Sequence, residues 1–103
     1  MVLKNMNDLV RQAQVMQNKM AKLQAEMAER VVDASAGGGM VKVSVNGKNE
    51  LKSITISPEV TNDVEMLQDL IVSAVNEANR IAKADMEREV SRITGGIKIP
   101  GMF

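Results

Sequence analysis

A β-hairpin signal in the middle of the chain limits the fold more than any other feature of the sequence. Asn46-Gly47 separates two short β-rich segments, and both residue types tolerate the positive φ that a type I′ hairpin turn requires. Val41, Val43 and Val45 alternate with polar residues before this pair, which predicts a strand with one apolar face. An isolated hairpin is at best marginally stable in water. The flanking segments must therefore cover that face.

The segment after the turn continues the hairpin but breaks its alternation once. Ile54 and Ile56 alternate with hydroxyl residues, whereas Leu51 has the opposite parity. We therefore expect a β-bulge or a longer loop near Lys48–Glu50. Val31 and Val32 begin a further extended segment ahead of the hairpin. The three predicted strands form a small antiparallel sheet and comprise residues 31–36, 40–45 and 50–57.

A run of three glycines, Gly37 to Gly39, joins the first two predicted strands. Glycine runs also occur in phosphate-binding loops, where the phosphate sits at a helix N-terminus. Neither a Lys-Ser/Thr pair nor a helix follows this run, so the sequence favours a flexible turn over a phosphate site.

Apolar residues recur with a heptad period between residues 5 and 30, which predicts a long first helix. Such a narrow seam favours packing against another helix over packing against a sheet. We interpret the methionines within it as helix–helix core, because a ligand groove is much rarer. The a positions hold Met6, Ala13, Met20 and Met27, and the d positions hold Leu9, Met16 and Leu23.

A second long helix is predicted over residues 63–93. Asn62 followed by Glu65 resembles a capping box at its start, and Gly95-Gly96 stops it. Its first half has a broad apolar face, whereas its second half keeps only Met86, Val90 and Ile93 among charged residues. We expect that half to be exposed or packed along a narrow seam. Residues 94–103 form a short apolar tail that either docks or stays free.

The two predicted helices are longer than the sheet between them. Helices of 25 to 30 residues are about 37 to 45 Å long, whereas a seven-residue strand spans about 23 Å. The overhanging parts still carry apolar residues, and a three-stranded sheet leaves open edges. We therefore expect a single α+β domain over residues 1–103, with an α-β-β-β-α order and two projecting helices, that forms a homodimer.

The composition excludes several classes of function. The chain has no Cys and no His, so it lacks thiolate metal sites, a cysteine nucleophile and the commonest general base. Its carboxylates lie at solvated helical positions, and no spacing resembles a calcium loop. With one aromatic residue, Phe103, the sheet offers no stacking platform for single-stranded nucleic acid. We expect no enzyme activity, no cofactor, no metal and no small-molecule substrate.

The formal net charge of zero conceals a segregation along the chain. Residues 58–79 contain five acidic residues and no basic one, whereas residues 1–30 and 80–103 each contain five basic and three acidic residues. From composition alone, an ordinary solvated helix surface is the favoured interpretation of this excess. No apolar run approaches the roughly 18 residues of a membrane span. The N-terminus also lacks a secretory signal, which predicts a cytoplasmic protein without a membrane partner.

The order of these features resembles the YbaB/EbfC family of bacterial nucleoid-associated proteins. Three stretches carry the resemblance and together cover nearly the whole chain. They are RQAQVMQNKMAKLQAEM (11–27), GGGMVKVSVNGKNELKSITISP (37–58) and DVEMLQDLIVSAVNEANRIA (63–82) with the closing TGGIKIPGMF. The family often has Asp before the Pro that ends the last strand, whereas this chain has Ser57.

The resemblance implies a tweezer-like homodimer that binds double-stranded DNA and alters its conformation. It also implies a location in the nucleoid and roles in gene expression and nucleoid organisation. Because phosphate contacts would dominate, we expect little sequence specificity and a loss of affinity with salt. The alternative is a protein-interaction module that uses the Met-rich seam without contacting DNA. The candidate DNA-binding residues are Arg11, Lys19 and Lys22 on the first helix and Lys83, Arg88 and Arg92 on the second.

Overall fold

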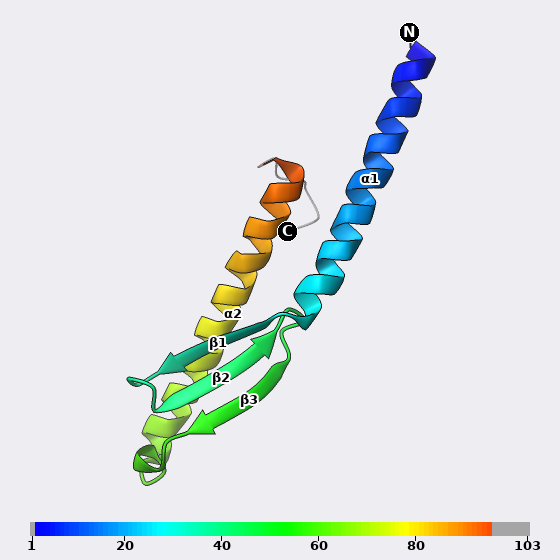
Figure 1. Ribbon diagram of the computed structural model, residues 1–103. Helices are drawn as coiled ribbons and strands as arrows, with labels where there is room; N and C mark the ends of the chain where they lie inside the picture. The colour runs from blue at the N-terminus through cyan, green and yellow to red at the C-terminus, as the bar shows by residue number, and fades with distance from the viewer. Residues whose placement is uncertain (1, 96–103) are drawn as a thin grey trace.

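The computed structural model describes residues 2–95 and shows an elongated α+β chain of 73 × 20 × 17 Å (Figure 1). In the chain, one long helix precedes and another follows a three-stranded sheet, as the sequence predicts. Except for Thr94 and Gly95, the expected apolar tail lies outside the described residues. In chain order the elements are α1 (Val2–Glu29), β1 (Val31–Ala36), β2 (Val41–Asn46), β3 (Leu51–Ile56), the short 3₁₀ helix η1 (Pro58–Val60) and α2 (Val64–Thr94).

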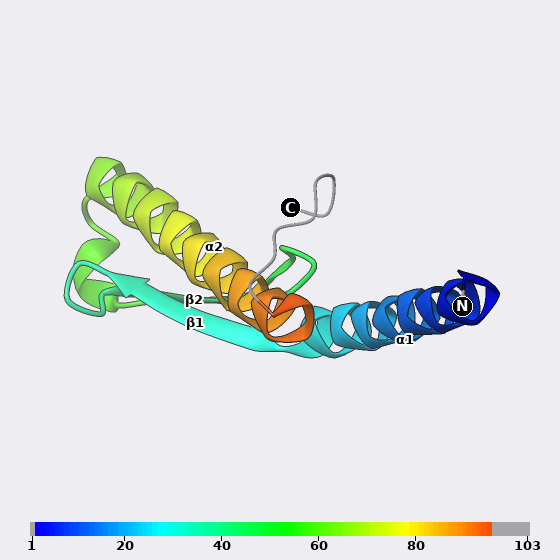
Figure 2. The ribbon, with the colours of Figure 1, turned by 90° about the horizontal axis from the view of Figure 1, so that it is seen from above.

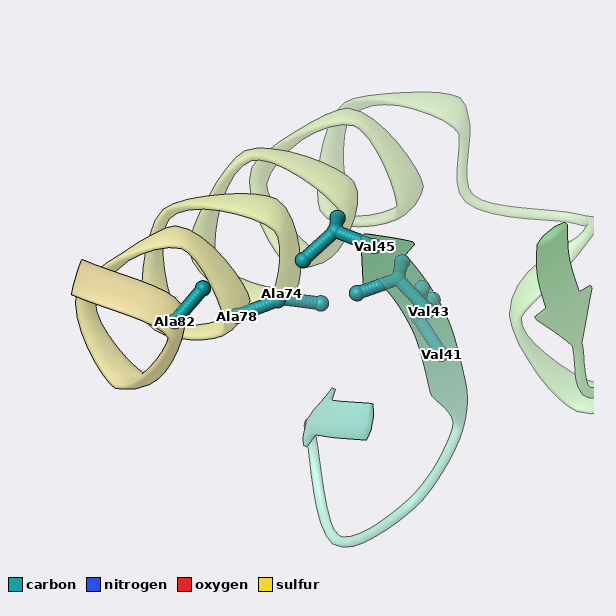
Figure 3. Close-up of a cluster of buried hydrophobic side chains, with 6 residues drawn as sticks. All are labelled: Val41, Val43, Val45, Ala74, Ala78 and Ala82. Atoms are coloured by element: carbon teal, nitrogen blue, oxygen red, sulfur yellow. The ribbon is translucent and has the colours of Figure 1, made fainter. Parts of the chain in front are cut away.

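The core lies between α2 and the sheet. The three strands are antiparallel in the order β1-β2-β3, and α2 packs across β1 and β2. Alternate valines of the central strand, predicted to form its apolar face, are at most 2% exposed. They lie against alanines spaced four residues apart on α2, whose small side chains let the helix approach the strand closely (Figure 3). The two sets are Val41, Val43 and Val45, and Ala74, Ala78 and Ala82.

The hairpin turn differs from the predicted one. Asn46 is the last residue of β2, and the loop continues through Gly47, Lys48 and Asn49. The residue with positive φ is Asn49 (63°), and Gly47 is not in the left-handed region. The Asn46 side chain organises the loop: its Oδ1 accepts hydrogen bonds from the backbone N–H groups of Lys48 and Glu50, at 2.9 and 3.0 Å. This local side-chain bonding favours the longer loop over the two-residue type I′ turn.

Gly47 is required for a different reason, namely its contact with the end of α1. A Cβ built on Gly47 would lie 1.9 Å from the carbonyl oxygen of Met27. No side chain fits between these two backbones. The hairpin loop and the last turn of α1 therefore touch through their main chains, and this contact lies at the base of the helix.

The expected bulge is present but lies farther along the chain. Val45 pairs with Leu51 and Ser44 pairs with Ser53, so Lys52 is the extra residue of β3. The bulge brings Leu51 to the same face as Ile54, which pairs with Val43. The parity of the apolar residues is thereby restored. The loop near Lys48–Glu50 is also longer than two residues, as the sequence predicted.

The ends of α2 are fixed by local polar contacts. The predicted cap Asn62 is wrong by one residue: Asp63 is the N-cap, and its side chain accepts a hydrogen bond from the backbone N–H of Met66 at 3.0 Å. Asn62 instead lies in the turn between η1, which Ser57 caps, and the N-cap of α2. At the other end Gly95 adopts a left-handed conformation (φ 68°) and ends the helix, as expected.

Candidate nucleic-acid interface

The two helices form arms that pair beyond the end of the sheet. The C-terminal half of α1 buries Met20, Leu23 and Met27 against Val90, with Met86 and Ile93 packed at the edge. This is the narrow apolar seam that the heptad period predicts, and it forms within one chain. Figure 2 shows α1 extending past the end of α2. Higher on α1 the seam is exposed, for instance at Leu9 (63%).

An ion-pair cluster holds the base of the two arms together. Arg30, directly after α1, donates a hydrogen bond from Nη1 to Asp85 Oδ2 on α2 at 2.7 Å. Arg88 donates to the other oxygen of the same carboxylate. The hydrogen bond from Arg30 lowers the pKa of the Asp85 carboxyl, whereas partial desolvation raises it. The hydrogen bond is the larger effect, so the pKa of Asp85 is lowered. Asp85 is thus a shared acceptor for two arginines.

Three of the predicted basic residues lie together in one shallow groove between the arms. Lys19 and Lys22 of α1 line it with Arg92 of α2. Two carboxylates, Glu26 and Glu89, line the same groove. The groove has a volume of about 250 Å³ and continues the exposed side of the apolar seam. Arg92 lies about 70 residues after Lys19 and Lys22 in the sequence, and the pairing of the two helices brings them together.

Helix periodicity places two more predicted residues on the same side of the arms. Arg11 lies eleven residues before Lys22, about three helical turns away, and so projects from the same side of α1. Arg88 lies one turn before Arg92 on α2. Together with Arg30, these residues form what we call the basic flank. It comprises Arg11, Lys19, Lys22, Arg30, Arg88 and Arg92.

Lys83 does not belong to the basic flank. It lies nine residues before Arg92, which is two and a half turns, and therefore faces the opposite side of α2. It lines a separate depression of about 490 Å³ with Met27, Gly47 and Asn79. The Oδ1 atom of Asn79 is buried there without a hydrogen-bond partner in the part of the chain that the structure describes.

Arg30 is the residue that sequence reasoning missed. It occupies the heptad position at which the apolar pattern ends. In the sequence it therefore indicates the end of the helix and nothing about a binding site. Its partner Asp85 lies 55 residues away, and no local spacing links the two. Only the antiparallel packing of α1 on α2 brings them together.

Other kinds of site are absent from residues 2–95. No group of three or more Asp and Glu side chains in this range is placed to hold a metal ion. Neither α1 nor α2 contains a stretch that is both long and apolar enough to cross a bilayer. The basic flank on the two arms is the surface feature that suits a polyanionic partner.

Comparison with known proteins identifies the group to which this chain is related. It matches the YbaB/EbfC DNA-binding family over residues 3–97. It is 54% identical over 101 residues to a nucleoid-associated protein of Alkaliphilus metalliredigens, which covers 96% of this chain and 89% of that protein. A nucleoid-associated protein of Acetivibrio thermocellus is 55% identical over 102 residues, with 96% and 90% covered.

The fold is also found among solved structures. The crystal structure of an uncharacterized protein from Helicobacter pylori is similar with a TM-score of 0.74 and 25% sequence identity. The similarity covers 84% of this chain and 94% of that one, so it extends over both helices and the sheet between them. The match over residues 3–97 and the high identity to the relatives agree with this fold. The chain belongs to the YbaB/EbfC DNA-binding family, which is not a family of enzymes.

Proposed function

We propose that this protein is a nucleoid-associated protein that binds double-stranded DNA as a homodimer through the basic flank. The observation that carries the proposal is the gathering of six basic residues on one side of two paired helices. These helices project beyond the sheet (Figure 1), so a long duplex can reach the flank without contacting the sheet. Membership of a DNA-binding family supports the same assignment.

The composition of the basic flank predicts the mode of binding. Lysine and arginine side chains on exposed helix surfaces contact phosphate oxygens, and such contacts carry no sequence information. The net charge of zero gives no long-range attraction to DNA. Affinity therefore depends on the local flank, and we expect it to be modest, weakly sequence-dependent and strongly reduced by salt. Two pairs of arms on one duplex would also alter its conformation.

Homodimer formation is supported by apolar surface on the β3 side of α2. No residue of β3 is buried: Ile54 and Ile56 are 38% and 37% exposed, although both face the helix side of the sheet. On α2, Val72 is 58% exposed. A second copy of the chain packed here would cover this surface and reach Asn79, whose Oδ1 has no hydrogen-bond partner among residues 2–95.

A titration of DNA binding against salt tests the proposal. Gel-shift assays on two unrelated duplexes should give similar affinities, and log K should fall linearly with log salt concentration. The double variant Lys19→Gln/Lys22→Gln should bind more weakly and have a shallower slope, by about 0.9 for each phosphate that the protein no longer neutralises. The matched control Lys42→Gln/Lys52→Gln removes the same charge from the sheet and should change the slope little. No shift at low salt and micromolar protein would refute DNA binding.

Light scattering tests the homodimer separately. The wild-type mass should be twice that of the chain, and Ile54→Lys should shift it towards the monomer because it places a charge in the apolar surface. Lys52→Gln on the same strand serves as the control. A monomeric wild-type protein at tens of micromolar would exclude the homodimer.

A second candidate function is supported by the exposed part of the α1 seam. Met6, Leu9 and Val10 are 55%, 63% and 58% exposed, and a helix of another protein could pack against them. A stoichiometric protein partner in a pull-down, with no nucleic acid co-purifying, would favour this interaction module over DNA binding.

A further inference from the structure

Three arginines of the basic flank, Arg30, Arg88 and Arg92, differ from its lysines in their ion-pair partners. Arg92 forms an ion pair with Glu89, with 3.1 Å between Nη1 and Oε1, and its Nη1 donates a hydrogen bond to Oε2 at 3.4 Å. Arg30 and Arg88 both donate to Asp85. In the free protein Asp85 and Glu89 therefore partly compensate the charges of Arg30, Arg88 and Arg92. Lys19, Lys22 and also Arg11 have no such carboxylate partner among residues 2–95.

The two carboxylates have different surroundings. The Asp85 side chain is 12% exposed, accepts from two arginines and ties α1 to α2, so its role is to hold the base of the arms. The Glu89 side chain is 18% exposed and pairs with one arginine, its own neighbour one turn along α2, whose side chain is 68% exposed. Together with Lys19 and Lys22, Glu89 thus lines the groove in which these cations would bind a phosphate.

We propose that Glu89 competes with DNA phosphate for Arg92 and thereby lowers the DNA affinity of the protein. The inference rests on the proposed DNA binding by the basic flank. On binding, Arg92 exchanges the Glu89 carboxylate for a phosphate oxygen, which is an acceptor of the same charge and similar geometry. The exchange therefore contributes little binding free energy. Glu89 also remains close to the phosphate and repels it. Glu89 therefore keeps the DNA affinity of the protein below the value that the cations of the groove would give without it.

The variant Glu89→Gln tests this competition. It releases Arg92 and removes the repulsion, so DNA should bind about 2- to 5-fold more tightly, the range that corresponds to one exposed ion pair. The salt dependence should become steeper, by about 0.9 in the log–log slope for the additional phosphate that Arg92 neutralises. Glu87→Gln is the matched control, because it removes the same charge from an exposed position of α2 that lines the opposite depression.

A double-mutant cycle with Arg92→Gln identifies the residue that is released. Arg92→Gln should weaken DNA binding more in the Glu89→Gln background than in the wild type, because only there is the guanidinium free of its carboxylate. Glu89→Ala repeats the test with a good helix former if the amide perturbs the helix. Circular dichroism melting curves confirm that each variant is folded.

The outcomes separate this inference from the proposed function. If the wild-type protein binds no duplex at low salt, the DNA-binding proposal itself fails. If the wild type binds and Glu89→Gln and Glu87→Gln tighten binding equally, net charge explains the effect and the competition is refuted. It is also refuted if Arg92→Gln has the same effect in both backgrounds.

Discussion

The substitution Gly47→Ala tests whether the hairpin loop holds the base of α1. The added Cβ would lie 1.9 Å from the carbonyl oxygen of Met27, 2.5 Å from its carbonyl carbon and 3.0 Å from the nitrogen of Ala28. All three atoms belong to the backbone of a regular helix, so no side-chain rotation can relieve the overlap. Gly47 does not have a positive φ, and the cost of alanine is therefore steric and not conformational.

The size of the effect follows from the displacement that the methyl group demands. A normal carbon–oxygen contact would require the loop and the helix to separate by more than about 1 Å. Overpacking of this kind costs about 1–3 kcal/mol, and we expect the upper half of that range because both partners are main chain. For a domain of about 100 residues this corresponds to a fall in Tm of roughly 8–20 °C.

Thermal unfolding followed by circular dichroism measures this fall. The matched control is Lys48→Ala, an exposed position in the same loop, which should leave Tm within about 2 °C of the wild type. Gly47→Ala should also weaken DNA binding at temperatures where it is folded, because it moves α1 relative to α2. A Tm for Gly47→Ala equal to that of the control would show that the loop does not constrain α1.

Three further changes test the packing and the polar contacts. Ala78→Leu puts a large side chain at a fully buried position between α2 and β2. It should lower the free energy of unfolding, measured by urea titration, by about 1–3 kcal/mol. An unchanged urea midpoint would contradict close packing. Asp63→Ala removes the α2 N-cap and should cost about 1 kcal/mol in the same assay, whereas Asn62→Ala should cost much less. The hydrogen bond from Arg30 lowers the pKa of Asp85 in the folded protein. The carboxylate therefore stabilises the fold above its ordinary pKa of 3.8, and this contribution is lost as the pH falls through the lower folded-state pKa. The wild type should therefore lose more stability than Asp85→Asn between about pH 4 and pH 2, and parallel pH profiles of the two Tm values would refute this role.

The elements of the fold could be predicted because each has a strong local pattern. The heptad period marked α1, the alternating valines marked β2, and glycine marked the end of α2. The longer loop near Lys48–Glu50 was expected, but the type of turn was predicted wrongly because Asn46-Gly47 has two different uses. Its asparagine organises the loop with its side chain, and its glycine allows a contact with a helix that precedes it by about 20 residues. Such a contact leaves no mark on the local sequence.

The arrangement of the candidate residues on the helices could be predicted in part, whereas their contact with DNA stays a prediction. Five of the six predicted basic residues lie on one side of the arms. Both helices are regular, and their apolar residues fix which side of each helix faces the seam. Lys83 falls on the other side, since it was selected by charge without regard to its helical phase. Arg30 was missed because its position depends on its pairing with Asp85, and the sequence did not show whether the arms pair within one chain.

The attachment of α1 at its lower end affects how far the two arms stand apart. α1 is 28 residues long, or about 42 Å, and its firm contacts are confined to its last three turns, the Gly47 loop and Arg30. A bend of about 10° where these contacts begin, near Met20, would displace the free tip, about 27 Å away, by about 5 Å, close to half the width of the DNA major groove. Small changes near Gly47 and Asp85 would therefore alter the spacing of phosphate contacts along the duplex, although neither residue lies near the tip.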